Sequence, residues 1–205
     1  MYIPKHFEQL SVDAMYELID NYPFATLVTC GDSGLCADHV PMEVDRSLGV
    51  LRCHVARANP VWRKVSDGTQ AMVIFQGPDA YISPSWYPTK TETGKVVPTW
   101  NYAVVHAHGS IRVGDDVQWK RNLVEKLANQ HEASFPDPWA VSDAPSDYIE
   151  KMLGSIVGME IAISKLEGKW KLSQNRPETD REGTVKGLRN LGATAMAELV
   201  ERGTD

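Results

Sequence analysis

The sequence predicts a mainly β protein of the α+β class, built around an antiparallel barrel. Short β-rich runs follow one another between residues 24 and 113, with short turns between them and a single small helical segment among them. Strand after strand with short connections is typical of a closed or nearly closed antiparallel barrel. The 205 residues suit one domain, residues 1–205, with a helical tail from about 176 to 205.

The first predicted elements are a helix and a hairpin. Residues 11–22 carry apolar side chains at helical spacing behind Ser11, a possible N-cap. Strands are predicted at 24–30 and 35–44, with GDSG (31–34) as the turn between them. Pro41 cannot donate a ladder hydrogen bond, so it belongs at an edge, at a bulge or beside a ligand.

The elements that follow are three further strand regions and one short helix. NPVWRKVSDG suits a helix with Asn59 as N-cap and Pro60 at the first helical position. The strands are predicted at 50–55, at 71–76 and 80–87 around a GPD turn, and at 97–113.

The second half changes character, because helical periodicity replaces most of the β-rich runs. Helices are predicted at 116–131 and 147–153, and residues 157–175 are predicted to form a last hairpin. The tail, residues 178–202, is predicted to form two helices around NLGAT.

Charge and composition exclude several functional classes. The formal charge of −6 and pI near 5.5 disfavour broad contact with nucleic acid or an anionic membrane. Cys30, Cys36 and Cys53 lie in apolar segments without a CxxC pair, and are predicted to be reduced core residues. No segment resembles a signal core or a membrane span. We therefore expect a soluble cytoplasmic protein without a membrane partner.

One stretch, HVARANPVWR (54–63), gathers groups that suit an anion. His54, Arg57 and Asn59 lie just before the predicted helix, whose N-terminus would add free N–H groups and a partial positive charge. The alternative is that Arg57 and Arg63 are solvated and that Asn59 only caps the helix.

His106 and His108 lie two residues apart on a predicted strand and therefore on one face. No carboxylate follows at a fitting distance, since Arg112 and Val113 occupy those positions. We expect no metal site and interpret both as hydrogen-bonded structural histidines.

Aromatic side chains form a third group, in AYISPSWY and PTWNY. Taken alone they suit ordinary packing, but beside an anion site they also suit a planar heteroaromatic ligand with a phosphate tail, such as flavin mononucleotide (FMN). GxSxG, GxGxxG and GxxxxGK[ST] are absent from the sequence, so neither a nucleophile elbow, a Rossmann dinucleotide site nor a P-loop is supported.

Together, MYIPKHF, CADHVPMEV, HVARANPVW, YISPSWY, VPTWNY with VHAHG, and KLSQNRPETDREGTVKGL resemble the PaiB family across almost the whole chain. Members of that family are described as FMN-binding negative transcriptional regulators. They belong to the FMN-binding split-barrel superfamily, related to pyridoxamine phosphate oxidase. The resemblance implies an FMN-binding split β-barrel with flanking helices, and a homodimer with two flavin sites at the subunit interface.

The resemblance also implies roles for particular residues. Phosphate-side contacts fall to Arg57 and Asn59, with His54 nearby. Arg57, Ala58 and Asn59 stand where the oxidases of the superfamily carry a more basic triplet, so this chain has fewer charges there. The remaining residues implied at the flavin are the backbone of His39, Val40, Pro41 and Met42 along the ring edge, Trp100 and Asn101 near the ring, and Lys171, Gln174 and Arg176 from the partner subunit.

Three functions stay open from the sequence. The first is a flavin-binding regulator, with DNA or another regulatory protein as partner; the second is a flavin-dependent oxidoreductase of a small molecule. Haem ligated by His106 or His108, as in haem-degrading split barrels, is the third. Residues 180–203 superficially resemble a helix-turn-helix, but residues 176–205 carry a net charge of −1. We therefore expect these helices to pack on their own barrel.

Overall fold

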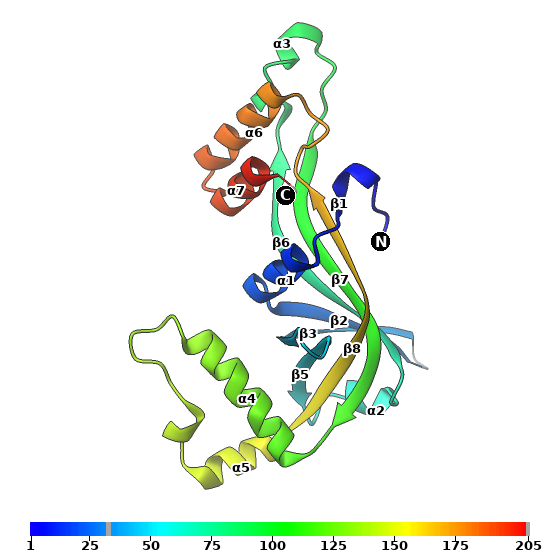
Figure 1. Cartoon of the computed structure of the whole chain (residues 1–205), viewed down its shortest axis with the longest axis vertical. Coiled ribbons are helices and arrows are strands. Elements are labelled where there is room, and N and C mark those ends of the chain that lie inside the picture. Colours follow the sequence, from blue (N-terminus) through cyan, green and yellow to red (C-terminus); the bar gives the residue numbers. More distant parts are fainter. Residues whose placement is uncertain (32–33, 204–205) are drawn as a thin grey trace. The chain divides into compact units, whose positions relative to one another are not determined.

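The computed structural model describes residues 1–31 and 34–203, which divide into two compact units (Figure 1). The barrel unit comprises Tyr22–Phe75 and Ala107–Lys165, and the helical unit comprises Met1–Asn21, Gln76–His106 and Leu166–Asp205. Three long strands contribute residues to both units: β6 (Gln70–Ile82), β7 (Thr99–Gly114) and β8 (Ile156–Lys171). The prediction of one domain with a helical tail stays a prediction.

The barrel unit is an antiparallel sheet in the order β3-β2-β6-β7-β8-β5-β4. Its β2–β3 hairpin runs in register from Phe24↔Pro41 to Gly31↔Gly34. The centre of the turn predicted at 31–34, residues 32 and 33, lies outside the described residues. The shorter strands are β2 (Phe24–Gly31), β3 (Gly34–Pro41), β4 (Glu43–Asp45) and β5 (Val50–Ala56).

The two end strands of this sheet, β3 and β4, are consecutive in the chain. β3 pairs with β2, the Met42 N–H donates to the Pro23 carbonyl at 2.9 Å, and β4 then pairs with β5. β3 and β5 lie against each other, although no ladder joins them in the described part of the chain. The sheet is therefore mainly antiparallel, as predicted, but it is not closed.

Alternating residues of the strands fill the barrel core. Inward positions of β2 include Ala25 and Leu27, those of β5 Leu51 and Val55, and β8 contributes Met159, all nearly inaccessible to solvent. Each large aliphatic side chain buried in this way contributes about 1.5–3 kcal/mol. This period-2 burial is what the β-rich runs in the sequence predicted.

Helices of the barrel unit are α2 (Val61–Lys64), α4 (Val117–Glu132) and α5 (Ser146–Gly154), with a 3₁₀ turn η3 (Val141–Asp143). α4 begins at an Asp116 cap, whose Oδ1 accepts from the Trp119 N–H at 2.7 Å. Trp119 packs on β8 at Gly158, where a Cβ atom would lie 1.9 Å from the indole. The predicted helices at 116–131 and 147–153 are thus confirmed.

The helical unit begins with η1 (Lys5–Phe7), β1 (Glu8–Gln9) and α1 (Val12–Asn21), and β1 pairs with β8. The Ser11 hydroxyl accepts from the Ala14 N–H at 3.2 Å, which confirms the predicted cap of α1. Its other helices are η2 (Pro84–Trp86), α3 (Lys90–Thr93), α6 (Glu178–Asn190) and α7 (Thr194–Arg202), so the two predicted tail helices are also confirmed.

α6 packs closely on η2 within the helical unit. A Cβ atom at Gly187 would lie 2.2 Å from the Trp86 ring, and one at Gly183 would lie 2.0 Å from the Trp86 carbonyl oxygen. The Asp180 carboxylate, fully buried, accepts from the N–H and hydroxyl of Thr89 at 3.2 and 2.8 Å. One face of α6 is therefore committed to its own unit.

Two predicted turns are wrong, because β6 and β8 each continue through them. A Cβ atom at Gly77, in the predicted GPD turn, would lie 2.9 Å from Leu18 Cδ1. One at Gly168, in the predicted 157–175 hairpin, would lie 2.9 Å from Met15. Each glycine serves close packing of α1 on a strand rather than a change of chain direction.

Further corrections concern the helix predicted at 59–68 and the cysteines. Only Val61–Lys64 is helical, because Val65 is extended and buried. Cys53 is buried as predicted, whereas Cys30 and Cys36 are exposed near the tip of the β2–β3 hairpin. None of the described helices is both long and apolar enough to cross a membrane.

Candidate functional site

In the barrel unit, the edges of β3 and β5 face each other without a ladder between them in the described chain. β4 pairs only with Val50–Arg52, so the described ladders leave Cys53–Ala56 with β8 alone as neighbour. The outer edge of β3 has no ladder partner in the described chain. Unpaired strand edges present backbone donors and acceptors to whatever lies beside them.

The predicted segment His39–Met42 lies on this edge. Val40 and Met42 are buried in the barrel, and the Met42 N–H is already used by the Pro23 carbonyl. His39 is exposed, with its ring tilted against Phe24 at 6.4 Å between centroids. Pro41 ends β3 at the sheet edge, which is one of the positions that its missing N–H allowed.

His54 lies in the half of β5 that β4 leaves uncovered. Its Nδ1 atom is buried and has no hydrogen-bond partner within residues 1–31 and 34–203. Burial lowers the pKa of His54, so the imidazole is neutral at pH 7 and Nδ1 can either donate or accept. A buried polar atom without a partner fits a bound polar ligand, such as a flavin, at this edge.

Arg57 is already engaged by the protein. Its guanidinium forms a two-pronged pair with Asp115, while Nε donates to the Gly154 carbonyl at 2.7 Å and Nη2 to the Ile156 carbonyl at 3.0 Å. Four of its five N–H groups are thereby used, and one on Nη1 is left for a ligand.

A second cation shares the Asp115 carboxylate. Lys120 of α4 is 2% exposed, and its ammonium donates to Asp115 at 2.7 Å and to the Leu153 carbonyl at 2.8 Å. Hydrogen bonds from Arg57 and then from Lys120 lower the pKa of Asp115 to about 2. The cluster Arg57–Asp115–Lys120 ties the end of β5 to α4 and to the α5–β8 junction.

Asn59 links the start of α2 to β3. Its Oδ1 accepts from the Val61 N–H at 2.9 Å, and its Nδ2 donates to Asp38 at 2.6 Å. The helix begins one residue later than predicted, with Pro60 rather than Asn59 at the N-cap position. Because α2 is a single turn of four residues, the predicted contribution of a helix dipole to anion binding is not supported.

The helical unit holds the second group of predicted residues. Asn101 of β7, Lys171 of β8 and Arg176 line one cavity of about 130 Å³. We call it the β7–β8 pocket; its other lining residues are Val97, Pro98, Thr99, Ser173 and Asn175. Family resemblance pointed to three of these residues, and the structure brings them together.

A rigid turn forms one wall of this pocket. Asn101 is fully buried, and its Nδ2 donates to Ser173 Oγ at 3.0 Å. Ser173 has φ +63°, and in the described chain it is the single non-glycine residue with positive φ. Gln174 holds the turn, since it accepts from the Leu172 N–H at 2.7 Å and donates to the Trp170 carbonyl at 2.6 Å.

Gln174 is therefore a positioning residue. The structure adds Thr99 and Ser173, which the sequence analysis did not single out. A serine between Leu172 and Gln174 gives no local signal of a left-handed conformation. The only feature of the sequence that could have pointed to Ser173 is its place within the family motif KLSQNR.

The two cations of the pocket lack carboxylate partners in the described chain. Lys171 donates to the Thr99 hydroxyl, and the Arg176 guanidinium lies over the Tyr87 ring at 4.8 Å. Burial lowers the pKa of Lys171, and the neighbouring charge of Lys169 lowers it further. Trp100, in contrast, is 54% exposed and packs edge-to-face on Tyr81.

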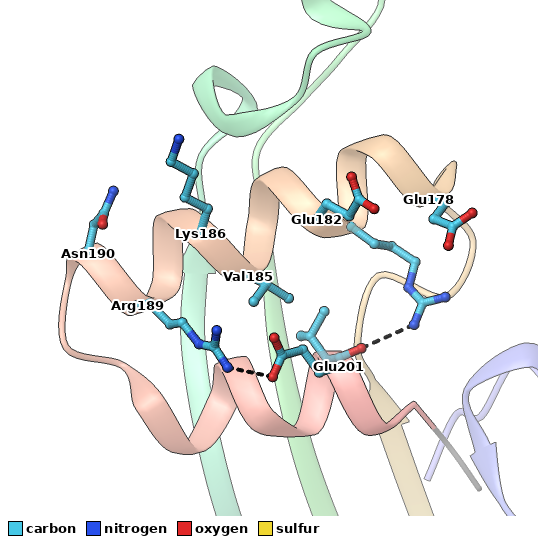
Figure 2. Close-up of a pocket in the computed structure, with 9 residues that line it drawn as sticks. Glu178, Glu182, Val185, Lys186, Arg189, Asn190 and Glu201 are labelled. Atoms are coloured by element: carbon cyan, nitrogen blue, oxygen red, sulfur yellow. Dashed lines mark hydrogen bonds and ion pairs between the residues drawn. The ribbon is translucent and has the colours of Figure 1, made fainter.

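A larger groove of about 510 Å³ lies between α6 and α7 (Figure 2). Its charges balance, with three carboxylates and three cations among the lining residues. Arg189 donates to Glu201 at 2.7 Å, and Arg181 to the Val200 carbonyl at 3.1 Å. None of the residues predicted at the flavin lines this groove, so its volume does not make it the flavin site.

Comparisons with known proteins give one family model and several relatives that match over almost their full length. The family described as "Putative FMN-binding domain" matches residues 1–165. The Bacillus subtilis protein named "Protease synthase and sporulation protein PAI 2" is 33% identical over 209 residues, covering 98% of this chain and 97% of its own. The uncharacterized protein AN0679 of Emericella nidulans is 35% identical over 245 residues, covering 99% and 98%.

Solved structures show the same fold at low sequence identity. An FAD- and haem-binding protein from Mycobacterium smegmatis has a TM-score of 0.61 at 17% identity, covering 88% of this chain and 80% of its own. A flavocytochrome from Azotobacter vinelandii also has a TM-score of 0.61, at 9% identity, covering 88% and 78%. The predicted split β-barrel with flanking helices is thus confirmed.

Proposed function

Because the chain belongs to the family of FMN-binding domains matched over residues 1–165, we propose that it is a homodimeric PaiB-type negative regulator of transcription. FMN is the cofactor. The observation that carries the FMN-binding part of the proposal is the unpaired β3–β5 edge of the barrel unit, where His54 Nδ1 is buried without a partner in the described chain.

The residues on this edge suit the two ends of FMN. The backbone of His39–Met42 is proposed to lie along the polar edge of the isoalloxazine ring. Because Pro41 has no N–H and the Met42 N–H donates to the Pro23 carbonyl, hydrogen bonds to the ring fall to the other backbone groups of the segment. His54 and Asn59 offer further polar groups, and Arg57 offers its remaining N–H to the phosphate. When bound, FMN supplies a group that can be reduced and reoxidised.

The second group of residues is proposed to act across the dimer. In this proposal Trp100 and Asn101 lie near the flavin ring, and Lys171 and Arg176 reach the flavin bound by the other subunit. Gln174 acts indirectly, by fixing the turn that carries Arg176.

Regulation is proposed to act through a partner protein more than through direct contact with DNA. A full-length relative is named for protease synthesis and sporulation, which suits a regulatory role. In the helix-turn-helix-like α6–α7 pair, however, α6 packs on Trp86, and the groove between the two helices carries balanced charge. DNA recognition depends on clustered Lys and Arg, which this pair lacks.

A flavin-dependent oxidoreductase is the second candidate. The β7–β8 pocket favours it, since a small cavity with two cations and no carboxylate among its described lining suits a small-molecule substrate. The regulator proposal requires no such cavity.

The proposal is tested first by binding. Titration with FMN should quench flavin fluorescence, and light scattering should give the mass of a dimer. A monomer, or unchanged fluorescence, would contradict the proposal.

Two further measurements distinguish a transcriptional repressor from an oxidoreductase. Duplex DNA binding that weakens with salt would indicate direct repression. Reduction of the bound FMN by NADH or NADPH, followed by turnover with a small acceptor, would instead favour the oxidoreductase.

A further inference from the structure

We propose that the β7–β8 pocket binds an oxyanion, the phosphate or carboxylate group of a small molecule. This inference rests on the pocket itself and holds whether the protein is a regulator or an enzyme. Its starting point is that Lys171 and Arg176 line one small cavity whose described residues include no carboxylate.

Charge is the first argument. Two like charges near one cavity repel each other, and neither has an ion pair in the part of the chain that the structure describes. An anion between them would interact favourably with both. The neutral lining residues Thr99 and Asn175 carry a hydroxyl and an amide group that can donate further hydrogen bonds. The α6–α7 groove has no comparable excess of positive charge, because its three cations are matched by three carboxylates.

Rigidity is the second argument. Ser173 is held in a left-handed conformation that L-residues rarely adopt, and the buried Asn101 side chain fixes its hydroxyl. Such strain is found where the surrounding structure over-determines it, often at ligand sites. Donors that are ordered before binding lose less conformational entropy when a ligand arrives.

The state of Lys171 agrees with these arguments. Its pKa is lowered by burial and by Lys169, which means that its positive charge lacks sufficient compensation in the free pocket. A bound anion would supply that compensation, so binding should raise the pKa of Lys171.

Size limits the ligand. A cavity of about 130 Å³ admits a phosphate or carboxylate group but not a flavin ring system, since pockets for drug-sized ligands measure about 300–1,000 Å³. The rest of the ligand would extend out of the pocket beside Val97, which is 65% exposed, and Pro98. The oxyanion has two possible sources, the phosphate of FMN itself or a separate small molecule.

The first arm of the test uses the FMN-loaded protein and inorganic phosphate. Calorimetric titration, with acetate as a second probe and sodium chloride as the ionic-strength control, gives the dissociation constants. If the oxyanion comes from a separate molecule, Lys171→Gln and Arg176→Gln should each weaken phosphate binding about tenfold or more, as for loss of a charge-assisted hydrogen bond. Lys186→Gln, a change in the α6–α7 groove, should leave it unchanged.

The second arm compares FMN with riboflavin in protein freed of flavin. If FMN supplies the oxyanion, the wild type should prefer FMN to riboflavin, Lys171→Gln should remove most of that preference, and added phosphate should not bind the FMN-loaded protein. Thermal unfolding of each variant establishes that it is folded.

The proposal is overturned if Lys171→Gln and Arg176→Gln change neither phosphate binding nor the preference for FMN over riboflavin. If the wild-type protein does not bind FMN, the proposed function is contradicted. The phosphate titration, carried out on the protein without flavin, would still test the pocket.

Discussion

The barrel unit and the helical unit each contain a pair of cations, and the pairs differ in their counter-charges. Arg57 and Lys120 share the carboxylate of Asp115, which lies within hydrogen-bonding distance of both. Lys171 and Arg176 face a cavity without a carboxylate among the described residues that line it. Two cations that share a carboxylate hold structure together, whereas a pair with no carboxylate is available for an anion. The number of basic residues in a sequence does not distinguish the two.

The largest expected effect is on stability, when the cluster Arg57–Asp115–Lys120 loses its carboxylate. Asp115→Ala leaves the buried Lys120 ammonium without its carboxylate, and breaking such a pair typically costs about 3–5 kcal/mol. Because Asp115 itself is half-exposed, we expect about 3 kcal/mol in urea-induced unfolding. Glu150→Ala, an exposed carboxylate of α5, is the control and should change stability by less than about 0.5 kcal/mol. If both variants lost the same free energy of unfolding, the cluster would have no special structural role.

Arg57→Ala separates structural support from phosphate contact. Loss of its hydrogen bonds to Asp115 and two carbonyl groups should lower the free energy of unfolding, by less than Asp115→Ala does. Loss of the remaining N–H should weaken FMN binding by about 1–3 kcal/mol, measured by flavin fluorescence. Lower stability with unchanged FMN affinity would leave Arg57 as a structural residue only.

Ser173 tests the rigidity of the uncompensated pocket. Ser173→Ala keeps the left-handed strain but removes the partner of the buried Asn101 amide, and should cost about 1–2 kcal/mol. Ser173→Gly removes the same hydroxyl but relieves the strain, so its loss should be smaller by about 0.5–1 kcal/mol. A glycine variant less stable than the alanine variant would show that the conformation is not strained.

The smallest effect is one of pH. The pKa of Asp115 is about 2, below its ordinary value of 3.8, so its contribution to stability is fully present well above pH 3.8 and is lost as the pH falls through about 2. The difference in urea midpoint between wild type and Asp115→Asn should therefore shrink between pH 5 and pH 2. A difference that stays constant over this range would place the carboxylate outside the pair.

Sequence periodicity predicted most of the fold. The β2 and β5 strands and the α1, α4, α6 and α7 helices follow from the β-rich runs, from the spacing of apolar residues and, for α1, from the Ser11 cap. The errors at Gly77 and Gly168 have a common cause, since a glycine that admits a neighbouring side chain and a glycine that turns the chain look alike in sequence.

Prediction of the candidate site was more limited. Arg57 and Asp115 are 58 positions apart, so sequence alone did not reveal that the arginine is neutralised. The grouping of Asn101, Lys171 and Arg176 came from family resemblance, because β7 and β8 bring together residues that are distant in the chain. The left-handed Ser173 depends on tertiary contacts and has no local signature.

Only Met42 separates β3 from β4, and each of these strands is paired with a different neighbour. The number of residues in the segment 34–45 is therefore fixed by the two registers. An insertion of a single residue at Met42 would leave β3 in place and turn every side chain of β4 to the opposite face of the sheet. The buried Glu43, which accepts from both Arg52 and Lys126, would then point away from them. Loops elsewhere tolerate gain or loss of residues, but here one added residue would turn one end strand of the sheet over while the other keeps its register.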